Sequence, residues 1–139
     1  MPQAKISLKA RLILYHKGRI LLLKQTKPNG GNYTLVGGTV EAGETARQSL
    51  IRESQEEAGI TLREKDLRLV HVMHKTKNVN QRVVLYFKAY RWEGELRALE
   101  PHKFKEVEWF DLDQLPRNLT QTVKKVLRDY RHGILYSEQ

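Results

Sequence analysis

The sequence has no cysteine among its 139 residues. This absence excludes disulfide bonds, thiolate metal sites and a cysteine nucleophile. No apolar run approaches the roughly 20 residues that a membrane-spanning helix requires, and the first residues, MPQAKISLKAR, lack the apolar core of a signal peptide. The length suits a single domain over residues 1–139, and we expect a cytoplasmic protein with no membrane partner.

Acidic residues are also absent from residues 1–40, which contain seven lysines and arginines. Residues 41–66 then contain seven acids against four bases, although the whole chain has a formal net charge of +9. An acidic segment in a basic chain suits a polyanionic substrate, because a bound cation and the surrounding bases can share its phosphates. A nucleic-acid surface is the less favoured alternative, since the sequence contains no recognised nucleic-acid-binding motif.

Apolar and polar residues alternate over residues 6–15, which predicts a half-buried strand. Apolar runs between turn residues predict further strands at 20–23, 33–36, 67–74, 82–92 and 105–110. A polar loop is expected at 75–81, and helical spacing predicts an amphipathic helix between Leu119 and Tyr130, ended by Gly133. This order of elements predicts an α/β fold with a mixed sheet between helices.

Another helix is expected within residues 45–59, because Thr45 and Gln48 have the spacing of a capping box and Gly59 can end a helix. The glutamates that share one face of this helix are Glu53, Glu56 and Glu57. Like charges at this spacing cost roughly 0.2–0.5 kcal/mol per pair, and the helix dipole disfavours anions in the last turn. A divalent cation would reverse both penalties. The alternative is a solvated acidic face paired with Arg52.

The spacing of residues 38–60 resembles the signature of the Nudix hydrolase superfamily. The residues at its fixed polar and glycine positions are Gly38, Glu44, Arg52, Glu53, Glu56, Glu57 and Gly59. One position departs, because Ser54 stands where the signature has a bulky apolar residue. The resemblance is to MutT-like members. It implies the α/β/α Nudix sandwich and metal-dependent hydrolysis of a nucleoside diphosphate linked to another moiety, with Mg²⁺ or Mn²⁺ as the cofactor.

The resemblance also implies roles for individual residues. Glu53, Glu56 and Glu57 would bind the metal, and Gly37 would add a backbone carbonyl unless the glycine pair forms only a tight bend. The general base would be Glu53 or Glu100. Glu100 would alternatively bind the metal, or it is an ordinary exposed loop acid. The residues expected to support the site structurally are Gly38, Glu44, Arg52 and Gly59.

Candidates for substrate binding lie outside the signature: Lys24, Tyr33, Arg82 and Asn118. Lys24 and Arg82 are strand-end cations that would contact phosphate or remain solvated. Tyr33 occupies a position that is often aromatic in the family, and Val36 replaces the usual proline before the two glycines. Asn118 would read the edge of a base or, as the favoured alternative, cap the last helix.

As the default that the resemblance leaves, we expect a nucleoside triphosphate pyrophosphohydrolase that releases a nucleoside monophosphate and pyrophosphate. Its partner would be a small-molecule nucleotide, and the sequence leaves the oligomeric state open. One alternative is removal of pyrophosphate from RNA 5′ ends, which the basic surface would favour. The other is a non-catalytic regulatory Nudix domain that binds nucleotide or RNA. No marker of an ADP-ribose, coenzyme A or dinucleoside polyphosphate enzyme is visible outside the signature.

Overall fold

The computed structural model describes residues 3–139. Its strands are β1 (Ile6–His16), β2 (Arg19–Gln25), β3 (Tyr33–Thr34), β4 (Gly37–Thr39), β5 (Arg68–Lys77), β6 (Asn80–Ala89), β7 (Phe104–Asp111) and β8 (Tyr136–Glu138). Its helices are α1 (Ala46–Ala58), α2 (Gln121–Arg131) and the short 3-10 helices η1 (Lys27–Asn29) and η2 (Glu64–Asp66). None of the helices within residues 3–139 is long and apolar enough to cross a membrane.

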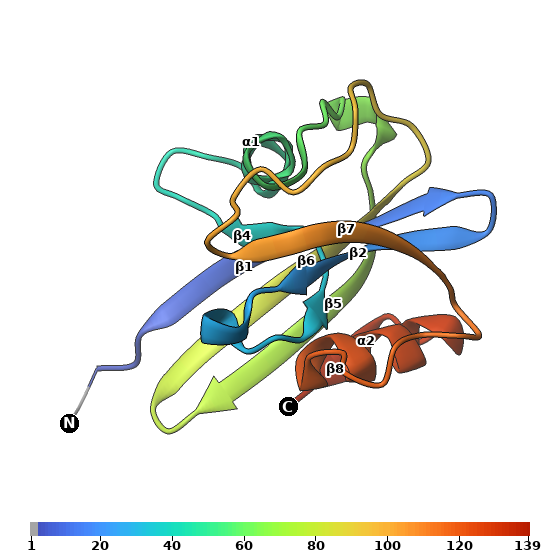
Figure 1. The fold of residues 1–139 in the computed structure, drawn as a ribbon. Coiled ribbons are helices and arrows are strands. Elements are labelled where there is room, and N and C mark those ends of the chain that lie inside the picture. Colours follow the sequence, from blue (N-terminus) through green and yellow to red (C-terminus); the bar gives the residue numbers. More distant parts are fainter. Residues whose placement is uncertain (1–2) are drawn as a thin grey trace.

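The strands in this part of the chain form one eight-stranded mixed sheet. Its main order is β3-β2-β1-β6-β5-β8, while β4 pairs with β1 and β7 pairs with β2. The β1–β6 and β5–β8 pairs are parallel, and the other pairs are antiparallel. Helix α1 covers one face of the sheet and α2 covers the other (Figure 1). The predicted α/β/α sandwich is therefore confirmed.

Each face of the sheet has its own apolar core, because successive side chains of a strand point to opposite faces. On the α1 side, Leu12 of β1 packs in one buried cluster with Leu50 of the helix. On the α2 side, the neighbouring Ile13 packs in a second cluster with Val126. The predicted alternation of β1 is confirmed, but both of its faces are buried near the middle of the strand.

Three details of the strand prediction were wrong. Residues 75–81 do not form a loop, since β5 runs to Lys77 and β6 begins at Asn80. The segment 33–36 is not one strand, because β3 ends at Thr34 and β4 begins only at Gly37. Strand β8 was not expected, and it pairs in parallel with β5 through backbone bonds that its polar sequence does not reveal.

The helix ends were predicted more accurately. Thr45 and Gln48 form both bonds of the capping box, and Gly59 ends α1 with φ of 70°. Gly133 follows α2 with φ of 74°. The expected cap of α2 was wrong, because its N-cap residue is Thr120. The side chain of Asn118 instead donates a hydrogen bond to the Gly31 carbonyl at 3.2 Å.

Candidate active site

The acidic helix α1 lies against the two glycines of β4. The Gly37 N–H donates a hydrogen bond to Glu57 Oε1 at 2.9 Å, and the Glu57 side chain is almost fully buried, with 4% of the residue exposed. A Cβ atom added to Gly38 would lie 2.6 Å from Glu53 Oε1. The carboxylates of Glu53 and Glu57 therefore both rest on the backbone of this glycine pair.

Gly37 is required by a close approach of two strands. Its φ is 145°, and an added Cβ atom would lie 2.1 Å from the carbonyl oxygen of Ala10 in β1. Residue 37 is paired with Arg11 in the antiparallel register of β1 and β4. A side chain at this position would force β4, and the carboxylates resting on it, away from the centre of the sheet.

Arg52 ties the loop before α1 to the acidic face of the helix. Its guanidinium group donates to both carboxylate oxygens of Glu44, at 2.7 and 3.0 Å. It also reaches Glu53 Oε1 at 3.0 Å and Glu56 Oε2 at 3.3 Å. The hydrogen bond from Arg52, followed by one from the Glu41 N–H, lowers the pKa of Glu44 to about 2. These contacts hold the Glu53 side chain in one orientation.

Burial makes two of the carboxylates unusually basic. It raises the pKa of Glu57 to about 7, while the Gly37 N–H acts in the opposite direction and the charges of Glu53 and Glu100 raise it further. Burial also raises the pKa of Glu53, although the hydrogen bond from Arg52 opposes this change. The charge of Glu100 adds to the effect on both. Desolvated carboxylates that repel one another gain stability from a bound cation.

The donor set fits a hard divalent cation, because it offers carboxylate oxygens and no sulfur. Within residues 3–139, no three histidine, cysteine or acidic side chains are already gathered into a closed metal cluster. Arg52 bonds both Glu53 and Glu56, and the Glu56 side chain is 51% exposed. Mg²⁺ suits such an open site, because it keeps several waters and needs only one or two carboxylates. The contact of Gly37 is made by its N–H, so its carbonyl ligand stays a prediction.

A hollow opens beside these carboxylates. The side chains and backbone that line it include Lys9, Arg11, Gln25, Thr34, Glu53 and Glu57. The first four of these residues also line an adjoining hollow, which continues over β5 and β6 to the start of α2. The two hollows therefore form one cleft, with acidic groups at one end and cations along the rest.

The structure brings only some of the predicted substrate residues to this cleft. Arg82 lines its second half. Lys24 instead lies with its Nζ atom 5.2 Å from the centre of the Tyr33 ring, and the Tyr33 hydroxyl donates to Glu108 at 2.7 Å. Neither residue lines the cleft, nor does Asn118. Glu100 acts electrostatically on the buried glutamates, and Lys103 lies 3.7 Å from its carboxylate.

Four cations of the cleft were not predicted as site residues from the sequence: Lys9, Arg11, Lys75 and Lys103. Lys9 and Arg11 occupy alternate positions of β1, so they share the face that carries Ile13. The alternation of β1 showed that Lys9 and Arg11 lie on its polar positions. It could not show that these positions line a cleft instead of open surface. Lys75 was placed in a polar loop, whereas it lies in β5 directly opposite Arg82.

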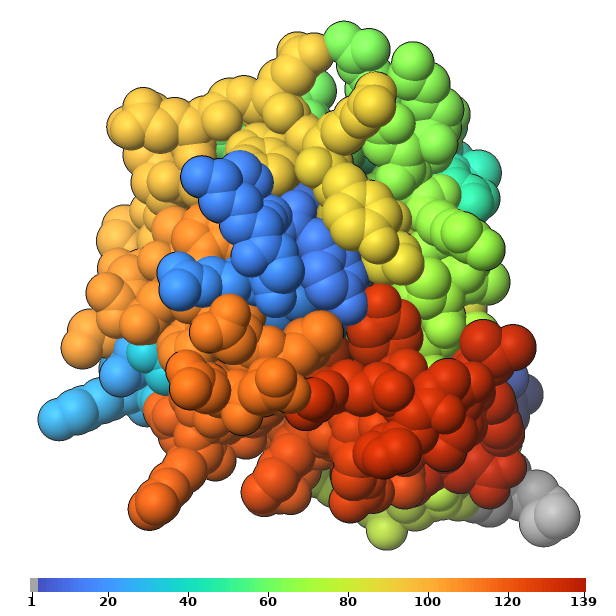
Figure 2. Space-filling model, turned by 90° about the vertical axis from the view of Figure 1, so that its right-hand side faces the viewer, coloured from blue at the N-terminus to red at the C-terminus, as the bar shows by residue number. Residues whose placement is uncertain are grey.

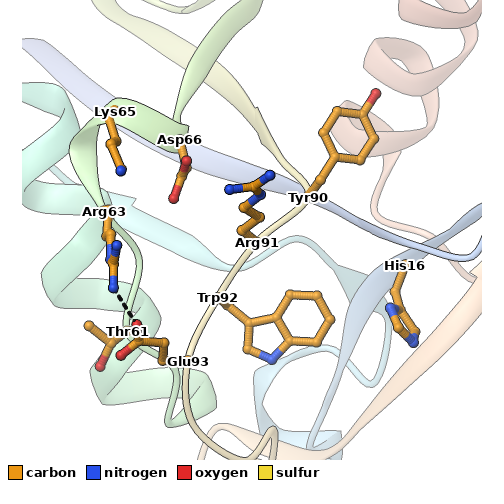
Figure 3. A pocket seen from close by; sticks show the side chains of 9 residues that line it. All are labelled: His16, Thr61, Arg63, Lys65, Asp66, Tyr90, Arg91, Trp92 and Glu93. Carbon is orange, nitrogen blue, oxygen red and sulfur yellow. Dashed lines mark hydrogen bonds and ion pairs between the residues drawn. The ribbon is translucent and has the colours of Figure 1, made fainter.

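Another hollow shares no lining residue with the cleft. It lies where residues 61–66 and 90–93 meet the tip of the β1–β2 hairpin, on the side of the molecule shown in Figure 2. Figure 3 shows Trp92 and His16 on one side of it and the ion pair of Arg63 with Glu93, at 2.6 Å, on the other. This hollow has no pair of neighbouring buried carboxylates, and it is not the candidate active site.

Comparison with known proteins agrees with this geometry. The NUDIX domain family matches residues 8–130. An "ADP-ribose pyrophosphatase" of Methanocaldococcus jannaschii is 34% identical over 119 residues, which cover 85% of this chain and 69% of that protein. The crystal structure of a MutT NUDIX hydrolase from Burkholderia pseudomallei has a TM-score of 0.80 and 31% identity, covering 89% of this chain and 97% of that one.

A third similarity covers less of the other protein. The "NAD-capped RNA hydrolase NudC" of Pectobacterium carotovorum is 32% identical over 107 residues, which are 76% of this chain but 39% of that protein. The NudC of Escherichia coli is 35% identical over 97 residues, or 36% of its length. The chain therefore spans well under half the length of these NudC relatives.

Proposed function

Since this chain belongs to the Nudix family and is a hydrolase of phosphoric anhydride bonds in nucleoside diphosphate-linked substrates, we propose that it cleaves a nucleoside triphosphate to a nucleoside monophosphate and pyrophosphate. The observation that supports this proposal is the placement of two desolvated carboxylates, Glu53 and Glu57, at the acidic end of a cleft lined by cations. A phosphate chain can lie along such a cleft with its anhydride bond beside the carboxylates.

In the proposed reaction, a water oxygen forms a bond to a phosphorus atom and the bridging oxygen leaves with the pyrophosphate. The proton of the water passes to a carboxylate, for which Glu53 and Glu100 are the candidates. When bound, Mg²⁺ or Mn²⁺ would neutralise the negative charge that develops on the phosphate oxygens. Glu53, Glu56 and Glu57 would hold this ion, and Arg52 would keep Glu53 oriented through the hydrogen bond at 3.0 Å.

The cations beside the carboxylates have a separate role in the proposal. Lys9 and Arg11 line the hollow next to Glu53 and Glu57, so they would bind the phosphate oxygens that the metal does not reach. Arg11 is held in place by a hydrogen bond from its Nη1 to the Leu35 carbonyl at 2.9 Å. A fixed cation needs no reorganisation during the reaction, and positioning of this kind accounts for much of the catalysis of phosphoryl transfer.

The test is Mg²⁺-dependent product release from a panel of nucleoside triphosphates, ADP-ribose and dinucleoside polyphosphates. The wild type would be compared with Glu57→Gln and with Glu64→Gln, which removes an exposed acid from η2. The proposal expects pyrophosphate from nucleoside triphosphates, loss of turnover in Glu57→Gln and full turnover in Glu64→Gln. Preferential cleavage of ADP-ribose would refute the triphosphate assignment. Metal-independent nucleotide binding that survives Glu57→Gln, without turnover, would favour a regulatory binding domain.

A further inference from the structure

Helix α2 leaves part of its face of the sheet uncovered, and this part is strongly basic. Strand register places Ser7 of β1, Arg82 of β6 and Lys75 of β5 in one row across the sheet. They lie on the same face as Val84, two residues along β6, which packs in the buried cluster with α2. In the next row of the same face, farther from α2, Lys77 is paired with Asn80. The cations therefore begin where the cover of α2 ends.

We name this surface the basic groove and define it by Lys5, Lys9, Arg11, Lys75, Lys77 and Arg82. Lys75 and Arg82 belong both to the cleft that adjoins the active site and to the outer hollow, so the groove is continuous. Among residues 3–139, no acidic side chain forms a salt bridge with any of these cations. The first turn of α2, which forms one wall, has no acidic residue either.

This arrangement is electrostatically unfavourable in the free protein. Like charges directly opposite each other in a sheet are destabilising, and Lys75 is directly opposite Arg82. Burial lowers the pKa of Lys75, and the charges of Arg82 and Lys77 lower it further. The side chain of Lys75 has a neutral partner only, the hydroxyl of Thr122 at 2.8 Å. Binding of a polyanion along this row would explain why the protein keeps unpaired cations that destabilise its free form.

The groove is longer than the site needs for one triphosphate. Arg11 is paired with Gly37 beside the carboxylates, and Lys5 lies six residues before Arg11 in the sequence. At about 3.3 Å per residue this distance is about 20 Å. A single strand of nucleic acid carries one phosphate per nucleotide, so a groove of this length can follow several successive phosphates.

We propose that the basic groove binds the phosphate backbone of single-stranded RNA whose 5′ phosphates occupy the active site. The inference deepens the proposed function and rests on it for the cleavage step alone. The aromatic side chains that line the cleft, Tyr86 and Phe104, are buried, so bases have no exposed ring there on which to stack. The groove therefore recognises phosphates, and binding is independent of base sequence.

The binding test uses a labelled, 5′-triphosphorylated RNA of about ten nucleotides and metal-free protein, so that no hydrolysis occurs. The double variant Lys75→Gln, Arg82→Gln is compared with Lys65→Gln, Arg91→Gln, which removes two exposed cations beside the other hollow (Figure 3). The slope of log affinity against log salt concentration should be shallower by about 1.4 in Lys75→Gln, Arg82→Gln, the groove variant. This is about 0.7 for each lost phosphate contact. The matched control should keep the wild-type slope. Equal slopes in all three proteins would overturn the inference.

The turnover test uses GTP and 5′-triphosphorylated RNAs of increasing length, with Mg²⁺. The ratio of kcat/KM for the longest RNA to that for GTP should fall about tenfold in the groove variant, which corresponds to two exposed ion pairs, and should not change in the matched control. A length-independent ratio in the wild type would overturn the inference. Groove-dependent RNA binding without hydrolysis of any substrate would refute the proposed function instead.

Two competitors identify the source of the phosphates. DNA of the same sequence has the same backbone charge and should compete with RNA in binding, although without a 5′ triphosphate it offers no anhydride bond to cleave. Inorganic polyphosphate of equal charge should compete less well, because its phosphates are spaced more closely than those of a strand. Polyphosphate that competes better than either polynucleotide would overturn the RNA assignment.

Discussion

Glu57 Oε1 accepts a hydrogen bond from the Gly37 N–H at 2.9 Å, although the two residues are 20 positions apart. The bond joins the last turn of α1 to the first residue of β4 and holds a carboxylate in a nearly dry position. Burial of the charge is unfavourable unless a cation neutralises it. Glu57 is therefore fixed in place by the fold and left electrostatically unsatisfied, as a metal-binding carboxylate would be.

Replacing Glu57 with glutamine should separate stability from activity. The glutamine Oε1 can still accept the bond from Gly37, and the buried charge is gone. We expect the metal-free variant to unfold at the wild-type Tm or above it, and its turnover to fall by orders of magnitude because a ligand of the proposed metal is lost. Differential scanning fluorimetry with and without Mg²⁺ provides a second readout, because a bound ion raises the Tm of the wild type. A variant that is stabilised by Mg²⁺ as much as the wild type would contradict the metal role of Glu57.

Neighbouring glycines should respond differently to alanine. In Gly37→Ala the new Cβ would meet the Ala10 carbonyl at 2.1 Å, so β4 must leave β1 and both stability and activity should fall. In Gly38→Ala the Cβ would meet only the Glu53 carboxylate, at 2.6 Å. A side chain moves more readily than backbone, so this variant should lose activity with a much smaller change of Tm. Tm and kcat are measured for both variants. An equal loss of stability in the two would contradict this arrangement of β4 and Glu53.

Ser54 is the one departure from the Nudix signature, and its buried hydroxyl lowers the stability of the fold. The residue is fully buried, and its Oγ has no hydrogen-bond partner among the described residues. An unsatisfied buried hydroxyl costs about 1–3 kcal/mol, so Ser54→Ala should raise the free energy of unfolding by about 1 kcal/mol. Ser49 provides the control, because it is also buried in α1 but donates to the Thr39 carbonyl at 3.3 Å. Ser49→Ala should be destabilising in the same urea titration.

Glu44 should make the protein sensitive to acid. Its pKa is lowered to about 2, first by the hydrogen bond from Arg52. A lowered pKa stabilises the fold above the ordinary pKa, and this stabilisation is lost as the pH falls toward the folded value. Glu44→Gln should therefore be less stable than the wild type near neutral pH and should lose less stability between about pH 5 and pH 2. Urea midpoints across this range measure the difference, and Glu95→Gln, which removes an exposed loop carboxyl, should follow the wild type.

How much the sequence revealed depended on whether the signal was local. The capping box at Thr45 and the left-handed Gly59 depend on a few adjacent residues, and both were predicted correctly. The bond between Gly37 and Glu57 and the row of Lys75 with Arg82 depend on strand register, which no short pattern encodes. The polar residues near Lys75 were interpreted as a loop, because strand positions over a charged cleft have the same composition as an exposed turn.

The missed strand β8 has a similar explanation. It is anchored by His71, a buried residue of β5, whose Nδ1 lies 2.9 Å from the Ile134 carbonyl and whose Nε2 lies 2.8 Å from Ser137 Oγ. The Ser137 hydroxyl in turn donates to Asp129 of α2. These contacts join β5 to two elements near the other end of the chain, α2 and β8. A lone histidine in a sequence does not indicate such a network, and its role here is to hold the last strand.

The charge of Lys9 should make polyanion binding depend on pH. Burial lowers its pKa to about 8, and the charges of Arg11, Arg82 and Lys75 act in the same direction, while Glu53 opposes them. Lys9 therefore loses its proton at a much lower pH than an ordinary lysine. A bound polyanion adds negative charge beside the ammonium group, so binding takes up a proton wherever the free side chain is neutral.

Lys9→Arg should remove most of this pH dependence, because a guanidinium group keeps its charge throughout the range. In metal-free wild type, the affinity for triphosphorylated RNA should fall as the pH rises from about 7 to about 9, through the pKa of Lys9 near 8. In the variant the decline should be shallower, and the part that remains should come from Lys75, whose pKa is also lowered. Fluorescence anisotropy across this range measures both curves. Lys65→Arg, outside the groove, should retain the wild-type slope, and equal slopes for wild type and Lys9→Arg would show that Lys9 does not face the bound phosphates.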